Sequence, residues 1–163
     1  MRTSLPALCV AALALFAMPA QAQRDPNLRP SESVWQPAPT PRGGVSWQVL
    51  ESTGEIERRE RGLVYSRPQF TSQVRALNGR RIKVNGYMMP LQNSARQSHF
   101  VLLGYPPDCP FHLNPAPDQF IEVRVTDPIP VGDGVRTIEG TLVLAGEDES
   151  GVFYKLTNAR EIG

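Results

Sequence analysis

The sequence is poor in cysteine and histidine: among its 163 residues are only two of each. One cysteine, Cys9, lies in a segment that we expect to be removed, which leaves Cys109 as the only thiol of the mature chain. A single thiol excludes an internal disulfide framework, so the fold must depend on packing of a hydrophobic core. With so little histidine, and with no nucleophile-elbow or zinc-protease motif, the sequence also argues against a hydrolase.

Long apolar runs are missing from most of the chain. After Ala22 no segment approaches the ~20 apolar residues that span a bilayer, so we expect no transmembrane segment in the mature chain. The first 22 residues combine a basic start at Arg2, an apolar stretch from Leu5 to Met18, and the small-x-small pattern Ala20-Gln21-Ala22. This pattern predicts a signal peptide over residues 1–22, cleaved after Ala22, and hence a periplasmic protein. A retained N-terminal anchor is the alternative.

An excess of charge of either sign is also absent. Removing Arg2 with the signal peptide leaves 16 of the 17 basic residues, which equals the 16 acidic residues. A neutral chain is a poor partner for nucleic acid, and we expect none. Removing 22 of the 163 residues leaves 141, the size of one domain. Residues 23–44 are polar and proline-rich and are predicted to be a disordered tether, and residues 45–163 are predicted to be one β-barrel-like domain.

Apolar residues recur with a period of two over most of the second half of the chain, which indicates β-strands. The predicted strands are residues 82–89, 100–103, 121–125, 138–144 and 152–156. Gly86 and Gly140 lie inside two of them, and glycine allows a strand to bend at a barrel corner. The fold class predicted is therefore mainly β, a small OB-like curved barrel, with a β-sandwich as the alternative.

Two segments before the strands are predicted from local signals. Ser66 to Gly79 has a capping serine, Pro68 in a first turn, apolar residues at helical spacing and an Asn-Gly stop, which together predict one short helix. Glu55 to Arg61 is a run of charges of both signs, which we interpret as a solvated connector.

The segment between the second and third predicted strands carries the residues suited to chemistry. Gly104 to Gln119 contains five prolines, which predicts a stiff surface loop. It presents Cys109 and His112, whose sulfur and imidazole can bind one Zn²⁺ or copper ion, and His99 is the candidate third ligand. Asp108 or Asp118 could add an oxygen. A cysteine buried under the loop and a hydrogen-bonded strand-end histidine are the non-functional alternatives.

Two functions of other classes compete with metal binding. Thiol–disulfide exchange needs a resolving thiol or an activated thiolate, and neither is visible, so we expect no enzyme. A protein-interaction module could instead use Tyr105, Phe111 and Phe120 beside the proline loop as its contact face.

The string from Leu77 to Leu91, which includes Gly86-Tyr87-Met88-Met89-Pro90, resembles a signature of an uncharacterised family of exported bacterial envelope proteins. The resemblance extends to His99-Phe100 and to the loop Cys109-Pro110-Phe111-His112, where relatives place a second cysteine. It implies metal handling, or accessory work for an ABC-type envelope transporter in a zinc-responsive setting. Histidine in place of that cysteine keeps a metal ligand and removes a redox pair, which favours metal over disulfide chemistry.

Overall fold

The computed structural model describes residues 36–107, 115–146 and 150–163. Within this part of the chain no helix has the length and apolar character needed to cross a membrane. The elements, in chain order, are α2 (Trp47–Leu50), β1 (Gly54–Glu60), β2 (Leu63–Gln69), α3 (Ser72–Arg75), β3 (Arg81–Pro90), β4 (Arg96–Leu103), β5 (Phe120–Pro130), β6 (Val135–Leu144) and β7 (Tyr154–Ile162).

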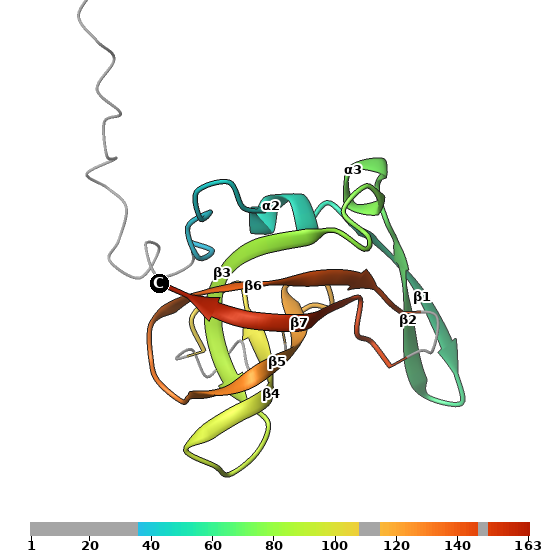
Figure 1. The fold of residues 1–163 in the computed structure, drawn as a ribbon. Helices are drawn as coiled ribbons and strands as arrows, with labels where there is room; N and C mark the ends of the chain where they lie inside the picture. Colours follow the sequence, from blue (N-terminus) through green and yellow to red (C-terminus); the bar gives the residue numbers. More distant parts are fainter. Residues whose placement is uncertain (1–35, 108–114, 147–149) are drawn as a thin grey trace, which may run out of the picture.

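Strands β3 to β7 close into a five-stranded barrel in the order β3-β4-β5-β7-β6, with β6 pairing back onto β3 (Figure 1). All neighbouring strands are antiparallel except β5 and β7, which are parallel. The prediction of a mainly β, OB-like curved barrel is thus confirmed, and the two packed sheets of a sandwich are not formed.

The alternation read from the sequence corresponds to the inside and outside of this barrel. In β3, Ile82, Val84 and Met88 are buried, whereas the residues between them are partly exposed. Gly86 takes the remaining inward position, where a Cβ atom would lie 2.6 Å from Cγ of Leu102. The strand glycines therefore allow close approach in the interior as well as curvature.

The helix predicted over Ser66–Gly79 is wrong for most of its length. Ser66 and Pro68 belong to strand β2, and the helix α3 comprises only Ser72–Arg75, with Thr71 rather than Ser66 as its N-cap. Pairing with β1 extends the backbone through Gln69 and overrides the local helix signals. The predicted left-handed stop does occur, because Gly79 has a φ of 72°.

The charge run Glu55–Arg61, interpreted as a connector, is also corrected by the structure. It forms β1 and the first residue of a tight turn, and β1 pairs with β2 in a separate two-stranded sheet. Arg61 and Gly62 connect the strands with φ values of 51° and 81°, as in the two-residue turns that suit hairpins. Charged residues are common on such strands because they discourage unwanted edge pairing.

Residues 36–44, the end of the segment predicted as a tether, contact the barrel. Ala38 is buried, and its N–H donates to the carbonyl oxygen of Gly104 at 2.8 Å. The side-chain amide of Asn85 donates to the carbonyl oxygen of Pro39 at 2.7 Å. An extended, proline-rich strap can thus be held by a few hydrogen bonds without forming a strand. The predicted signal peptide, residues 1–22, lies outside the described residues and stays a prediction.

Candidate functional site: the base of the proline-rich loop

Helix α2 fixes the start of the proline-rich loop. Ser46 caps the helix, its Oγ accepting from the N–H of Val49 at 3.3 Å, and Trp47 is buried in the core. The indole N–H of Trp47 donates to the carbonyl oxygen of Asn85 at 2.6 Å. Its ring also packs against Gly104, where a Cβ atom would lie only 2.8 Å from the ring. One aromatic side chain therefore joins α2, β3 and the start of the loop.

The two ends of the loop are tied together. The N–H of Gly104 donates to the carbonyl oxygen of Gln119 at 2.9 Å, and the N–H of Gln119 donates to that of Ala116 at 2.8 Å. The N–H of Ala38, in residues 36–44, donates to the carbonyl oxygen of Gly104. The residues that flank the loop are thus held in place by backbone bonds as well as by prolines.

Two of the three predicted metal ligands, Cys109 and His112, lie outside the described residues, as does Asp108, and their ligation stays a prediction. Over the described ranges, no group of three or more His, Cys, Asp or Glu side chains is placed to hold a metal ion. The candidate ligand Asp118 is described, close to the end of the loop.

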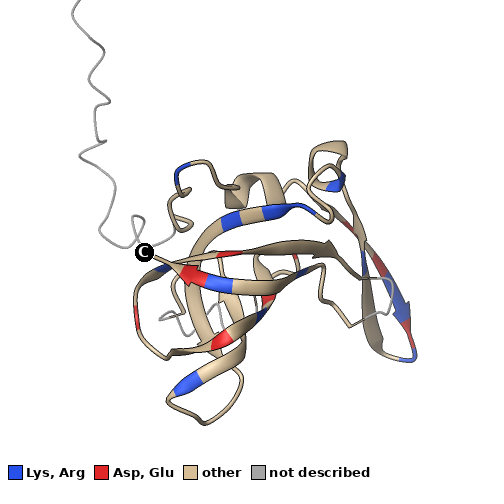
Figure 2. Cartoon of the chain, in the orientation of Figure 1, with Lys and Arg blue, Asp and Glu red and all other residues tan. Residues whose placement is uncertain are grey.

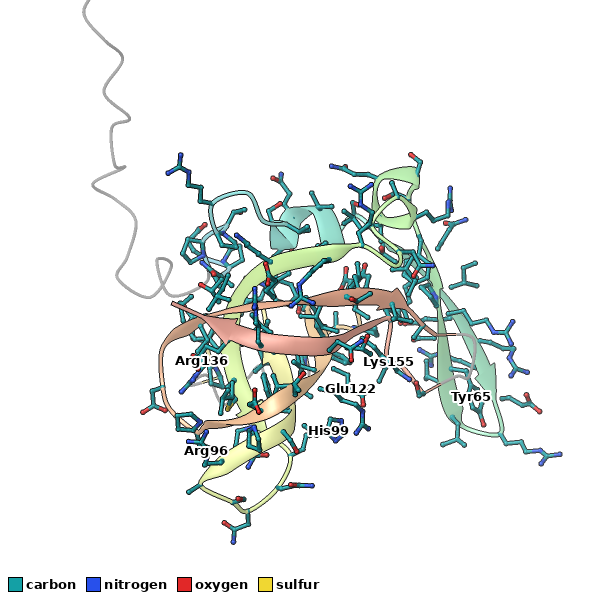
Figure 3. The ribbon with its side chains drawn as sticks, viewed as in Figure 1. Tyr65, Arg96, His99, Glu122, Arg136 and Lys155 are labelled. Carbon is teal, nitrogen blue, oxygen red and sulfur yellow. The ribbon has the colours of Figure 1, made fainter. Side chains whose placement is uncertain are left out.

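His99, the third predicted ligand, forms a hydrogen bond with Glu122 on the outside of the barrel (Figure 3). Its Nε2 lies 2.7 Å from Oε1 of Glu122, and the same oxygen lies 3.3 Å from the guanidinium of Arg124. The other carboxylate oxygen, Oε2, lies 3.9 Å from Nζ of Lys155. His99 is four residues from the end of β4 at Leu103, ~13 Å along the strand from the loop. A hydrogen-bonded histidine was the alternative interpretation, and the structure provides its partner.

At the base of the proline-rich loop the structure brings together the carboxyl groups of Glu51 and Asp118 and the phenol of Tyr105. Burial raises the pKa of the Asp118 carboxyl above its usual value, and the charges of Glu51 and Glu55 raise it further. Burial, a hydrogen bond to Glu51 and the charges of Glu51 and Asp118 raise the pKa of Tyr105 to about 12. Oε1 of Glu51 is buried and has no hydrogen-bond partner in the described part of the chain. The loop base is therefore a partly desolvated site of negative potential.

Tyr154 fixes the backbone on either side of Glu51 through two hydrogen bonds. Its hydroxyl donates to the carbonyl oxygen of Leu50 at 2.7 Å and lies 2.6 Å from Oγ of Thr53, which therefore acts as the donor to it. Burial raises the pKa of Tyr154 to about 12, with the charge of Asp118 adding to the rise and the Thr53 hydrogen bond opposing it. The chain segment that carries Glu51 is thus fixed on both sides.

Sequence reasoning named Asp118 and missed Glu51 and Tyr154. Glu51 follows a helix of only four residues and is far from the loop in sequence, so no local spacing relates it to Asp118. Tyr154 was identified only as a strand residue. Glu51, Asp118 and Tyr154 are far apart in the sequence, and only the topology of the barrel brings them together.

A hollow of about 670 Å³ lies beside the same loop, lined by Tyr87, Met88, Pro106, Pro107 and residues 132–134. Volumes of this size are typical of sites for small molecules or for the side chains of a partner. Next to it, Nη1 of Arg136 donates to Glu161 at 2.7 Å, while the Arg136 Nε–H is buried and has no partner among the described residues. The lining includes both apolar side chains and the carboxyl group of Asp133.

Comparisons with known proteins place the chain in a family but assign no activity. No curated protein matches the sequence. A crystal structure of a DUF3299 family protein from Pseudomonas aeruginosa PAO1 is similar over 55% of this chain, with 22% identity and a TM-score of 0.45. The match covers 66% of the length of that chain. The sequence pattern of the family described as "Protein of unknown function (DUF3299)" matches residues 20–159. The chain therefore belongs to the DUF3299 family, which confirms the expected membership in a family of unknown function.

Proposed function

We propose that this protein is a non-enzymatic, periplasmic accessory protein that binds or delivers a metal ion of the zinc or copper class in the bacterial envelope. The observation that carries the proposal is Oε1 of Glu51, which is buried at the base of the loop that bears Cys109 and His112 and has no hydrogen-bond partner among the described residues. A buried carboxylate oxygen without a partner is costly, and a cation is the group that would satisfy it. Asp118 adds a second carboxylate at the same place.

The donor set fits such an ion. Thiolate, imidazole and carboxylate are all zinc ligands, and structural sites commonly use four of them. Cys109, His112, Asp118 and Glu51 would supply that number from one loop and the helix next to it. His99 stays the predicted third ligand, although its Nε2 already contacts Glu122. When bound, the ion would neutralise the cluster of acidic groups. Service to an ABC-type envelope transporter follows from the family resemblance noted above and is part of the proposal.

Titration calorimetry of the purified protein with zinc sulfate, and separately with Cu(I), tests the metal role. We expect one ion per chain, and an affinity at least ~10-fold lower in Cys109→Ser, His112→Ala and Asp118→Asn because each loses one ligand. Affinity should fall as the pH falls, since the ligands must be deprotonated, and the raised pKa of Asp118 places its loss at a higher pH than for an ordinary aspartate.

Asp133→Asn, in the turn between β5 and β6, is the matched control and should bind as the wild type does. Without metal, Asp118→Asn should melt at the same or a higher temperature near neutral pH. A carboxyl with a raised pKa makes the fold less stable as pH rises through that pKa, so removing its charge relieves this cost. Failure of the wild type to bind either metal, or unchanged affinity in Asp118→Asn, would refute the assignment.

The hollow lined by Pro106 and Pro107 favours a second candidate, a module that docks on an envelope transport protein without metal. A photo-crosslinking residue at Pro107 should then capture a transport component in cells, while the same probe at Val143, exposed on β6, should not. Equal capture from both positions would contradict docking at the hollow. Metal binding and docking are thus measured independently.

A further inference from the structure

The strap formed by residues 36–44 leads toward the hollow beside the proline-rich loop. Directly after the strap, the N–H of Val45 donates to the carbonyl oxygen of Lys83 in β3 at 2.8 Å. Nearer the start of the strap, Asn85 in β3 donates to the carbonyl oxygen of Pro39 at 2.7 Å. Toward its N-terminal end the strap therefore follows β3 in the direction of Tyr87, which lines the hollow.

A second contact of the strap leads to the same place. The N–H of Ala38 donates to the carbonyl oxygen of Gly104 at 2.8 Å, and Pro106, two residues after Gly104, lines the hollow. Trp35 lies outside the described residues, but it precedes Ala38 by only three positions. Three residues span at most ~10 Å, so the chain length places the Trp35 side chain within reach of the hollow.

The composition of the hollow suits an indole ring. Its lining combines the Tyr87 ring, the Met88 thioether and the rings of Pro106 and Pro107, and it includes Asp133. The second half of β3, which forms part of this surface, carries no charged residue (Figure 2). Apolar rings and sulfur pack well against an aromatic face, and a carboxylate accepts the N–H for which a buried tryptophan usually finds a partner.

The segment before the barrel offers one side chain of this kind. Trp35 is the only aromatic residue among residues 23–44, which are otherwise mostly polar, charged or proline. An aromatic residue in such a segment gains most by leaving water. A side chain of another protein could compete for the hollow, but Trp35 is joined to the barrel through a few residues, which gives it a high effective concentration there.

We propose that Trp35 of this chain occupies the hollow lined by Tyr87, Pro106 and Pro107, with its indole N–H donating to Asp133. The N-terminal segment is thereby held to the barrel one step beyond the strap, by a side chain as well as by backbone hydrogen bonds. A partner that docks at the hollow has to displace Trp35 first, a consequence that rests on the docking function proposed above.

Acrylamide quenching of tryptophan fluorescence in the mature chain tests the proposal. The chain has two tryptophans and Trp47 is buried, so the difference between the wild type and Trp35→Ser isolates the signal of Trp35. Pockets bury about 70–90% of the surface of a bound group, so we expect a quenching constant about 3- to 10-fold lower than in a synthetic peptide of residues 28–40.

Pro107→Glu, which places a charge among the apolar groups of the hollow, should raise the quenching constant of Trp35 to that of the peptide. Val143→Glu, an exposed position elsewhere on the barrel, is the matched control and should change nothing. Pro107 and Val143 are both exposed, so both variants should keep the wild-type melting temperature.

Three results would overturn the proposal. The first is a wild-type quenching constant equal to that of the peptide, and the second is protection that survives Pro107→Glu. The third is protection that increases with protein concentration, because it indicates that Trp35 of a second copy fills the hollow. Zinc and transport proteins are absent from this assay, so its failure is distinguishable from failure of either proposed function.

Discussion

Replacing Trp47 by alanine is expected to destabilise the barrel by about 3–5 kcal/mol, the usual cost of truncating a buried aromatic side chain to alanine. Trp47 is 1% exposed, donates its indole N–H to Asn85 in β3, and packs on Gly104 at the start of the loop. For a domain of this size the loss corresponds to a decrease in melting temperature on the order of 10–20 °C. Chemical denaturation monitored by far-ultraviolet circular dichroism measures it.

Trp47→Phe separates packing from the hydrogen bond. Phenylalanine keeps much of the ring contact with Gly104 but leaves the carbonyl oxygen of Asn85 without its donor, so we expect a loss of about 1–3 kcal/mol. A Trp47→Ala protein as stable as the wild type would show that α2 is not part of the cooperative fold. Because Trp47 also packs on Gly104 at the start of the loop, its removal should also weaken the proposed zinc binding.

Replacing Gly86 by alanine should destabilise the protein by at least about 1–3 kcal/mol, the range for extra atoms in a packed core. The new Cβ would lie 2.6 Å from Cγ of Leu102 and 2.7 Å from the backbone oxygen of Leu103. The Leu102 side chain can rotate, but the backbone oxygen belongs to the β3–β4 pairing, so the strands must separate locally. The free energy of unfolding in urea gives the size of the effect.

Gly79→Ala provides the comparison. No atom lies within 4 Å of a Cβ at Gly79, but its φ is 72°, so the substitution pays only for a left-handed backbone, roughly 1–2 kcal/mol. Gly86 is not among the glycines with a positive φ, so a Gly86→Ala protein as stable as the wild type would show that steric exclusion is not what requires glycine at position 86. If Gly86→Ala loses more, the close approach of the strands is the cause.

The barrel could be predicted because its signal is local. The alternation of Ile82, Val84 and Met88 with more polar neighbours indicates a strand with one buried and one exposed face. Similar alternation indicates the other strands of the barrel. The hairpin could not be predicted in this way, because β1 has charges on both faces and buries neither. Its one local signal is Arg61-Gly62, a weaker form of the Asn-Gly turn.

The candidate site was only half accessible to sequence reasoning. The proline-rich loop and its predicted metal ligands Cys109 and His112 are adjacent in the sequence, so both could be identified from it directly. The acidic group close to Asp118 is Glu51, whose charge raises the pKa of Asp118. Closure of the barrel and the hydrogen bond between Tyr154 and Thr53 place Glu51 there. His99 shows the opposite error: it is close to the loop in sequence, but strand geometry directs its imidazole to Glu122.

The position of β7 has a consequence for how the molecule is made. This final strand inserts between β5 and β6, so neither neighbour completes its pairing until Tyr154–Ile162 is present. A polypeptide that is synthesised N-terminus first therefore has an open sheet until residues 154–162 have emerged. During that interval the edges of β5 and β6 are free to pair with the strands of other chains.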